Sequence, residues 1–264
     1  MSQLPYLEGD VRAMFDAWAE RMRARHAAAL TFAELRKGVQ ALGVLDEPAD
    51  FGGETSRRLL EGRGKRAALA TFRAQLSFLT VHHAALMLDL GRWAPVRRVI
   101  DLGAGTGGAG AALSLALGGA RVEPVDRSGW ALERAVETAR AFGLAARPRR
   151  GELPEAVGRP GRGDVLLAAW IFRELDPPVR AGLRAALVAA LRRGARVAVL
   201  EMPGVPQGWW RRLAAAFEPF GVREELIRVA IDRPPLIREI DRAARLDHQV
   251  LGARVLYGPE DSSR

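Results

Sequence analysis

The spacing of hydrophobic residues changes near residue 95, and this change divides the chain into two parts. Before that point apolar residues recur at the interval of about 3.6 positions that places them on one face of a helix. The first such series is formed by Val11, Met14, Phe15, Trp18 and Met22. The pattern predicts a helical N-terminal region.

Helix boundaries within this region are marked by polar residues and glycines. Thr31, followed three positions later by a glutamate, has the form of a capping box and predicts a helix start. Gly43 is expected to end that helix, and residues 46–53 read as a loop. A longer helical pattern runs over residues 65–90. We therefore expect residues 1–95 to form a helical N-terminal cap.

After Pro95 short apolar runs rich in β-branched residues alternate with helical stretches. Strands are expected at 98–102, 121–126, 164–171 and 195–201, and helices at 109–117, 129–142, 178–191 and 208–217. Regular alternation of strand and helix is typical of a parallel sheet with helices on both faces. The sequence thus predicts an α/β fold with a doubly wound, mostly parallel sheet over residues 96–264.

Composition narrows the classes of protein to consider. Hydrophobic residues make up 48% of the 264 residues, which is enough for a sizeable core. The chain has no cysteine, which excludes disulfides, thiolate metal sites and a thiol nucleophile. No apolar run reaches the roughly 18 residues of a membrane span, and the polar start lacks a secretory pattern. We expect a cytoplasmic protein without a membrane partner.

The chain is basic, with a formal net charge of +9. Lys37 and Lys65 are the only lysines, so nearly all of the positive charge is carried by arginine. The densest basic stretch covers residues 57–73. Such a surface is typical of contact with a polyanion such as RNA, or it is simply solvated. Both interpretations stay open at this point.

A glycine-rich turn follows the first expected strand and precedes a helix. Gly103, Gly105 and Gly107 alternate with other residues there, and Asp101 lies two positions before the first glycine. Glycine lets the backbone approach a ligand closely and adopt a positive φ. Asp126 ends the next expected strand, where a carboxylate can accept hydrogen bonds from both ribose hydroxyls of a nucleoside.

The turn also fits a second kind of nucleotide site. Gly103, Gly105 and Gly108 satisfy the spacing of the dinucleotide fingerprint. The carboxylate of Asp101 favours a different ligand, because it would repel a pyrophosphate but neutralise the ammonium group of a methionine moiety. S-adenosylmethionine (SAM) is therefore the preferred cofactor, and a nicotinamide dinucleotide is the alternative.

Residues 98–201 resemble a class I SAM-dependent methyltransferase, a family with a Rossmann-like fold. The resemblance implies a cofactor site in which Asp101, Gly103, Gly105 and Gly107 hold the amino-acid part of SAM, Asp126 holds the ribose and Glu152 binds the adenine amino group. Trp170 follows the fourth strand, where the family lines the methyl-transfer pocket, and it either packs on the cofactor or belongs to the core. The family usually has Asp where this chain has Glu152.

Three short segments resemble a narrower group, the methyltransferase-like proteins associated with the small ribosomal subunit. They cover residues 126–132, 172–175 and 200–204. This resemblance implies ribosomal RNA or the small subunit as a partner. Members of that group often carry cysteines that bind an iron–sulfur cluster, and this chain has none, so no metal cluster is expected.

Methyl transfer to a hydroxyl or protonated nitrogen benefits from a general base. The candidates near the strand ends are Glu174, Arg173 and Glu201, and Glu174 is the one we favour. The absence of cysteine excludes methylation of a pyrimidine C5 through a cysteine adduct. We expect a methyltransferase acting on an O or N acceptor. The alternatives are a non-catalytic RNA or ribosome-assembly factor and a small-molecule methyltransferase of secondary metabolism.

Overall fold

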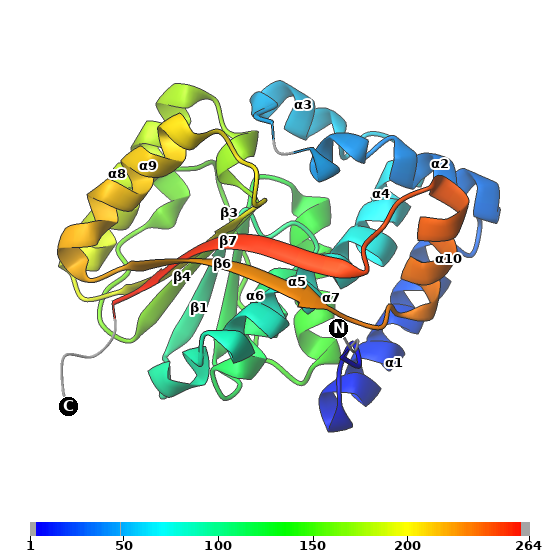
Figure 1. The fold of residues 1–264 in the computed structure, drawn as a ribbon, viewed down its shortest axis with the longest axis horizontal. Helices are drawn as coiled ribbons and strands as arrows, with labels where there is room; N and C mark the ends of the chain where they lie inside the picture. Colours follow the sequence, from blue (N-terminus) through cyan, green and yellow to red (C-terminus); the bar gives the residue numbers. More distant parts are fainter. Residues whose placement is uncertain (1–3, 48, 260–264) are drawn as a thin grey trace.

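The computed structural model describes residues 4–47 and 49–259, which fold around one seven-stranded sheet (Figure 1). The strands lie in the order β3-β2-β1-β4-β5-β7-β6. Their bounds are β1 Arg98–Leu102, β2 Arg121–Asp126, β3 Arg149–Arg150, β4 Asp164–Ala169, β5 Arg196–Glu201, β6 Arg223–Ala230 and β7 Val250–Gly258. The β5–β7 and β7–β6 pairs are antiparallel, and the other pairs of these strands are parallel. This arrangement confirms the predicted α/β, Rossmann-like fold.

The register of the central strands brings their carboxyl ends to one edge of the sheet. Val99 of β1 lies opposite Val122 of β2 and Val165 of β4. Side chains then alternate between the two faces: Val99 belongs to the hydrophobic cluster on one face, and Ile100 belongs to the cluster on the other. Both faces are apolar because both are covered by helices.

Helices cover the two faces unequally. The helices after β1 are α6 Gly108–Ala116, α7 Gly129–Ala141, α8 Pro177–Arg192, α9 Gln207–Phe217 and α10 Pro235–Ala244. Leu183 of α8 and Trp210 of α9 pack against one face, and Leu113 of α6 lies in the cluster on the other. The N-terminal helices pack in the same cluster as α6.

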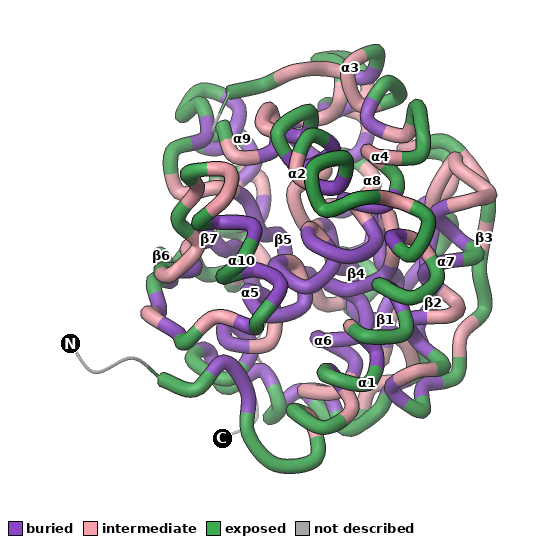
Figure 2. Tube along the Cα trace, turned by 90° about the vertical axis from the view of Figure 1, so that its right-hand side faces the viewer, coloured by how far each residue is buried: buried purple, intermediate pink, exposed green. Residues whose placement is uncertain are grey.

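The N-terminal region consists of two longer helices, α1 and the buried α5, with shorter helices between them. Their bounds are α1 Gly9–His26, α2 Phe32–Gln40, η1 Gly43–Asp46, α3 Gly52–Arg58, α4 Arg63–Ala68 and α5 Ala74–Met87, with a π-helical turn at Leu69–Arg73. Figure 2 shows α5 buried in the centre of the molecule and α2 largely exposed. Phe78 and Leu79 of α5 are fully buried and share one cluster with the sheet. These helices therefore complete the core.

The structure differs from the sequence-based prediction at two places. A strand was expected over residues 164–171, but β4 ends at Ala169 because Trp170 has a left-handed backbone with φ 59°. The C-terminal β6, α10 and β7 were not assigned from the sequence. The division into a cap of residues 1–95 and a domain of residues 96–264 stays a prediction.

None of the helices formed by the described residues has both the length and the apolar character needed to cross a membrane.

Candidate active site

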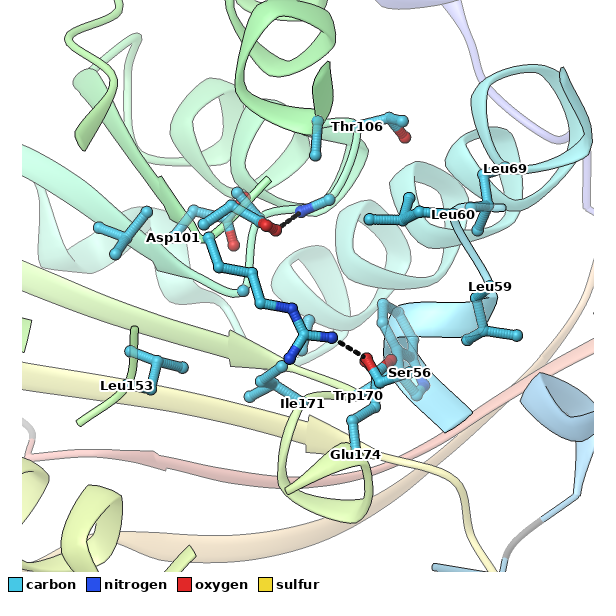
Figure 3. A pocket seen from close by; sticks show the side chains of 18 of the residues that line it. Ser56, Leu59, Leu60, Leu69, Asp101, Thr106, Leu153, Trp170, Ile171 and Glu174 are labelled. Carbon is cyan, nitrogen blue, oxygen red and sulfur yellow. Dashed lines mark hydrogen bonds between the residues drawn. The ribbon is translucent and has the colours of Figure 1, made fainter. Parts of the chain in front are cut away.

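A pocket of about 240 Å³ opens at the carboxyl ends of β1, β2 and β4. Open α/β sheets bind ligands at this edge. Figure 3 shows Leu59, Leu60 and Leu69 of the N-terminal region on one side of the pocket, and Asp101 and Leu153 on the other. The N-terminal helices therefore form a roof over the strand ends.

The three glycines of the predicted turn differ in what lies beside them, either the pocket or packed protein atoms. Gly103, Gly105 and Gly107 all have positive φ, with values of 70°, 51° and 81°. A Cβ on Gly105 would meet no atom within 4 Å, whereas a Cβ on Gly107 would lie 2.7 Å from the backbone of Ala135. A Cβ on Gly103 would clash with the side chain of Ile171. Gly103 and Gly105 line the pocket; Gly107 does not, and serves the close packing of α7.

Asp126 lies at the end of β2 on the floor of the pocket. Its Oδ2 accepts a hydrogen bond from the Gly105 amide at 3.0 Å, and its Oδ1 accepts one from the Ser128 amide at 2.8 Å. Burial raises the pKa of this carboxyl. The two amide donors hold the carboxylate in place, and its remaining lone pairs can accept hydroxyl donors from a ligand.

Asp101 is the most deeply buried of the predicted site residues, with 1% of its surface exposed. Its Oδ2 accepts a hydrogen bond from the amide of Gly110 at 3.1 Å. Burial raises the pKa of Asp101 to about 7, and the nearby charge of Asp126 acts in the same direction. Asp101 forms no ion pair with any residue that the structure describes. It is thus an acid without a counter-charge that lines a pocket.

Glu152 and Trp170 also line the pocket. Glu152 is exposed at its margin, directly after Gly151, whose amide donates to the backbone oxygen of Asp126 at 3.1 Å. The left-handed Trp170 is half-buried, and its amide donates to the carbonyl of Leu200 at 2.7 Å. Both side chains therefore border the same pocket as Asp101 and Asp126, and their cofactor roles stay predictions.

Glu174 belongs to η5, a short 3₁₀ helix at Phe172–Glu174 that follows β4. The hydroxyl of Ser56 in α3 donates to Glu174 Oε2 at 2.6 Å. Arg127, just after β2, donates in turn to the Ser56 hydroxyl at 3.1 Å (Figure 3). Burial raises the pKa of Glu174. This places a carboxylate of increased basicity at the pocket, held by a residue of the roof.

Arg173, the neighbour of Glu174, has a structural task. Its guanidinium is fully buried and donates to the backbone oxygens of Leu45 and Glu47, at 2.6 Å for Leu45. Its Nε lies 3.8 Å from Oε2 of Glu201, a fully buried carboxyl whose pKa burial raises to about 8. Arg173 therefore fastens the η1 segment of the roof to the sheet, and Glu201 lies beside its guanidinium.

Ser56 and Arg127 were not identified from the sequence. No motif marks Ser56, and its contact with Glu174 depends on how the N-terminal helices fold back over the sheet. The basic stretch around Ser56 is also divided in the structure: Arg73 forms a largely buried ion pair with Asp46, and Arg66 lies 5.6 Å above the ring of Trp130. Arg73 and Arg66 are therefore engaged in contacts within the protein, whereas Arg57, Arg58 and Arg63 of the same stretch are exposed.

A metal centre is not formed by the described residues, since nowhere among them do three His, Asp or Glu side chains gather as a ligand set.

Comparisons with known proteins do not assign the chain to a family. No protein-family model matches the chain, and a search of curated proteins also gives no match. Solved structures of similar fold include a precorrin-6y C5,15-methyltransferase from Geobacter metallireducens, with 13% identity, coverage of 66% of this chain and 85% of that one, and a TM-score of 0.46.

Two further structures belong to archaeal proteins. A precorrin 8W decarboxylase from Methanobacterium thermoautotrophicum has 18% sequence identity to this chain and a TM-score of 0.45. The match covers 67% of this chain and 88% of that one. A candidate RNA methyltransferase from Pyrococcus horikoshii has 17% sequence identity and a TM-score of 0.44. The match covers 69% of this chain and 83% of that one. At such low identity the likeness concerns the fold alone.

Proposed function

We propose that this protein is a SAM-dependent methyltransferase whose cofactor site is the pocket beneath the N-terminal helices. The observation that carries the proposal is the open space above the Gly105 backbone beside the fixed carboxylate of Asp126. A glycine with φ 51° and no neighbour in the direction of a Cβ leaves room for a ligand rather than for packing. An acid two residues before the turn suits a cationic amino acid better than a pyrophosphate.

The pocket residues offer partners for the ammonium, ribose and adenine groups of SAM. Asp101, an acid without a counter-charge, would pair with the ammonium group, and such a pairing would return its raised pKa toward the ordinary value. Asp126 would accept hydrogen bonds from the ribose hydroxyls, and Glu152 from the adenine amino group. Trp170 would pack beside the reactive end of the ligand. SAM supplies a methyl group activated by a positive sulfonium.

Glu174 is the proposed general base. Its carboxylate would accept the proton from the acceptor oxygen or nitrogen as that atom gains the methyl group. The Ser56 hydroxyl orients the carboxylate, and Arg127 holds Ser56 in place. The leucines of the roof exclude water, which strengthens polar interactions within the pocket.

Two classes of acceptor are consistent with this pocket. The resemblance to proteins associated with the small ribosomal subunit favours ribosomal RNA or a ribosomal component. The apolar roof of Leu59, Leu60 and Leu69 favours a small molecule, because it covers the strand ends where a folded RNA would have to enter. We place the small-molecule acceptor first on the ground of this roof.

The test is transfer of a labelled methyl group from SAM to fractionated acceptors. Purified protein would be incubated with labelled SAM and either ribosomal subunits, deproteinised RNA or a small-molecule extract. We expect label in one fraction, and a decrease of about 10²-fold or more in Glu174→Gln. SAM binding without transfer to any fraction would support the non-catalytic alternative and overturn the enzymatic proposal.

A further inference from the structure

A second hollow, of about 360 Å³, lies beside β2 and β3 and shares no residue with the pocket under the roof. It is lined by Arg98, Glu123, Arg147, Pro148, Arg149, Val157 and Arg159. Glu123 lies opposite Ile100 in the parallel register, and Ile100 and Val157 belong to the cluster on the α8 face of the sheet. The hollow thus opens on the α8 face, away from the roof.

Two of its arginines are held in fixed positions by one buried acid. The side chain of Glu123 is only 7% exposed. Arg98 Nη1 lies 2.6 Å from one of its carboxylate oxygens, and Arg149 Nη2 lies 2.7 Å from the other. Arg98 also pairs with the buried Asp164 at 3.0 Å. These bonds fix the guanidinium planes at the wall of the hollow before any ligand arrives.

The other two arginines leave the positive charge of the hollow uncompensated. Arg147 and Arg159 are exposed, and neither guanidinium contacts an acid or a hydrogen-bond acceptor among residues 4–47 and 49–259. The Nε atom of Arg149 is buried without a hydrogen-bond partner. Four arginines therefore face one glutamate, a net lining charge of 4 − 1 = +3.

We propose that this hollow binds a phosphate group. Guanidinium groups present forked N–H donors that match phosphate oxygens in pairs, and fixed arginines lose little freedom when they bind. A doubly charged anion would relieve the repulsion between the arginines and would accept hydrogen bonds from the exposed guanidinium groups of Arg147 and Arg159. The phosphate belongs either to a small phosphorylated molecule or to the backbone of a nucleic acid.

A charge-matched pair of double variants tests this site. Arg147→Glu/Arg159→Glu removes the two unpaired arginines, while Arg21→Glu/Arg242→Glu makes the same change of net charge at exposed positions of α1 and α10. Both sets lack side-chain partners among the described residues, so both variants should fold; circular dichroism and SAM affinity check this. The probes are inorganic pyrophosphate, by calorimetry, and a short fluorescent single-stranded RNA, by anisotropy.

We expect the Arg147/Arg159 variant to bind a probe at least tenfold more weakly than wild type at low salt, with a shallower salt dependence, because about two fewer phosphate contacts are made. The Arg21/Arg242 variant should stay within about threefold of wild type. Binding of pyrophosphate but not RNA would identify a small phosphorylated ligand, and competition of the two would identify the RNA backbone. Equal weakening in both variants, or no binding of either probe to wild type, would overturn the proposal.

Discussion

Ser56 donates a hydrogen bond to Glu174 at 2.6 Å, although 118 positions separate them in the chain. The bond joins α3 of the roof to η5, the turn that follows β4. The proposed base is therefore held by a residue that reaches the pocket only when the N-terminal helices are in place. Closure of the roof and orientation of the base are consequences of the same contact.

The first prediction concerns the pH dependence of methyl transfer. The rate should fall with decreasing pH as Glu174 becomes protonated. Since the hydrogen bond from Ser56 lowers the pKa of this carboxyl, Ser56→Ala should shift the acidic limb of kcat/KM to higher pH. Ser56→Thr, which keeps the hydroxyl, should restore the wild-type profile. An unchanged profile in Ser56→Ala would show that Glu174 is not the titrating base.

The second prediction is that the open space beside Gly105 holds SAM. Gly105→Val should abolish SAM binding, because its side chain would enter the pocket, and its positive φ would add about 1–2 kcal/mol of strain. Gly129→Ala is the control, since a Cβ there meets no atom within 4 Å and its φ is not positive. Calorimetry should show unchanged affinity in the control. Wild-type affinity in a folded Gly105→Val would remove the cofactor from this turn.

The third prediction is that Asp101→Asn has opposite effects on stability and on binding. Burial raises the pKa of Asp101 from 3.8 to about 7, so ionisation of this group costs folding free energy as pH rises from about 4 to about 7. Asparagine can still accept the hydrogen bond from Gly110 but carries no charge. The variant should gain stability over wild type across this pH range, measured by urea unfolding.

At the same time Asp101→Asn should bind SAM about tenfold or more weakly, because the ammonium group loses its counter-charge. A variant less stable than wild type at pH 8, or one with full SAM affinity, would contradict the role assigned to this acid.

The fourth prediction concerns a partly buried histidine, His248, that bridges η1 and α10. His248 lies with its ring nitrogens 2.7 Å from Asp241 and 3.4 Å from Asp46; Arg233 and Arg73 pair with the same two acids. Burial opposes the charged form, but the two carboxylates prevail and raise the pKa of His248.

The stabilisation from charged His248 is therefore complete below about pH 6.5 and is lost as pH rises through the folded-state pKa. The free energy of unfolding of wild type should exceed that of His248→Gln by about 1–3 kcal/mol near pH 6, and the difference should shrink toward pH 9. Urea titrations at several pH values measure it. A difference that grows with pH would show that the histidine is neutral in the folded protein.

The sequence was informative about the fold where local patterns decide it. Alternating strand and helix patterns gave the parallel sheet, and the glycine turn gave Gly105 and Asp126 at its edge. The sequence was less informative where tertiary contacts decide. It placed Arg173 among the charged residues near the strand ends, but the buried bonds of Arg173 to backbone oxygens of the roof depend on the folded structure. Gly107 read as part of the cofactor turn, although its lack of a Cβ serves packing against Ala135.

Calorimetric titration with SAM and with NADH tests the central claim most directly. The account predicts low-micromolar binding of SAM to the wild-type protein and no measurable binding of NADH. Asp126→Ala should weaken SAM binding by about 10- to 100-fold, since hydrogen bonds to a charged acceptor are worth about 1.5–3 kcal/mol. Tighter binding of NADH than of SAM, or an affinity for SAM that Asp126→Ala leaves unchanged, would contradict it.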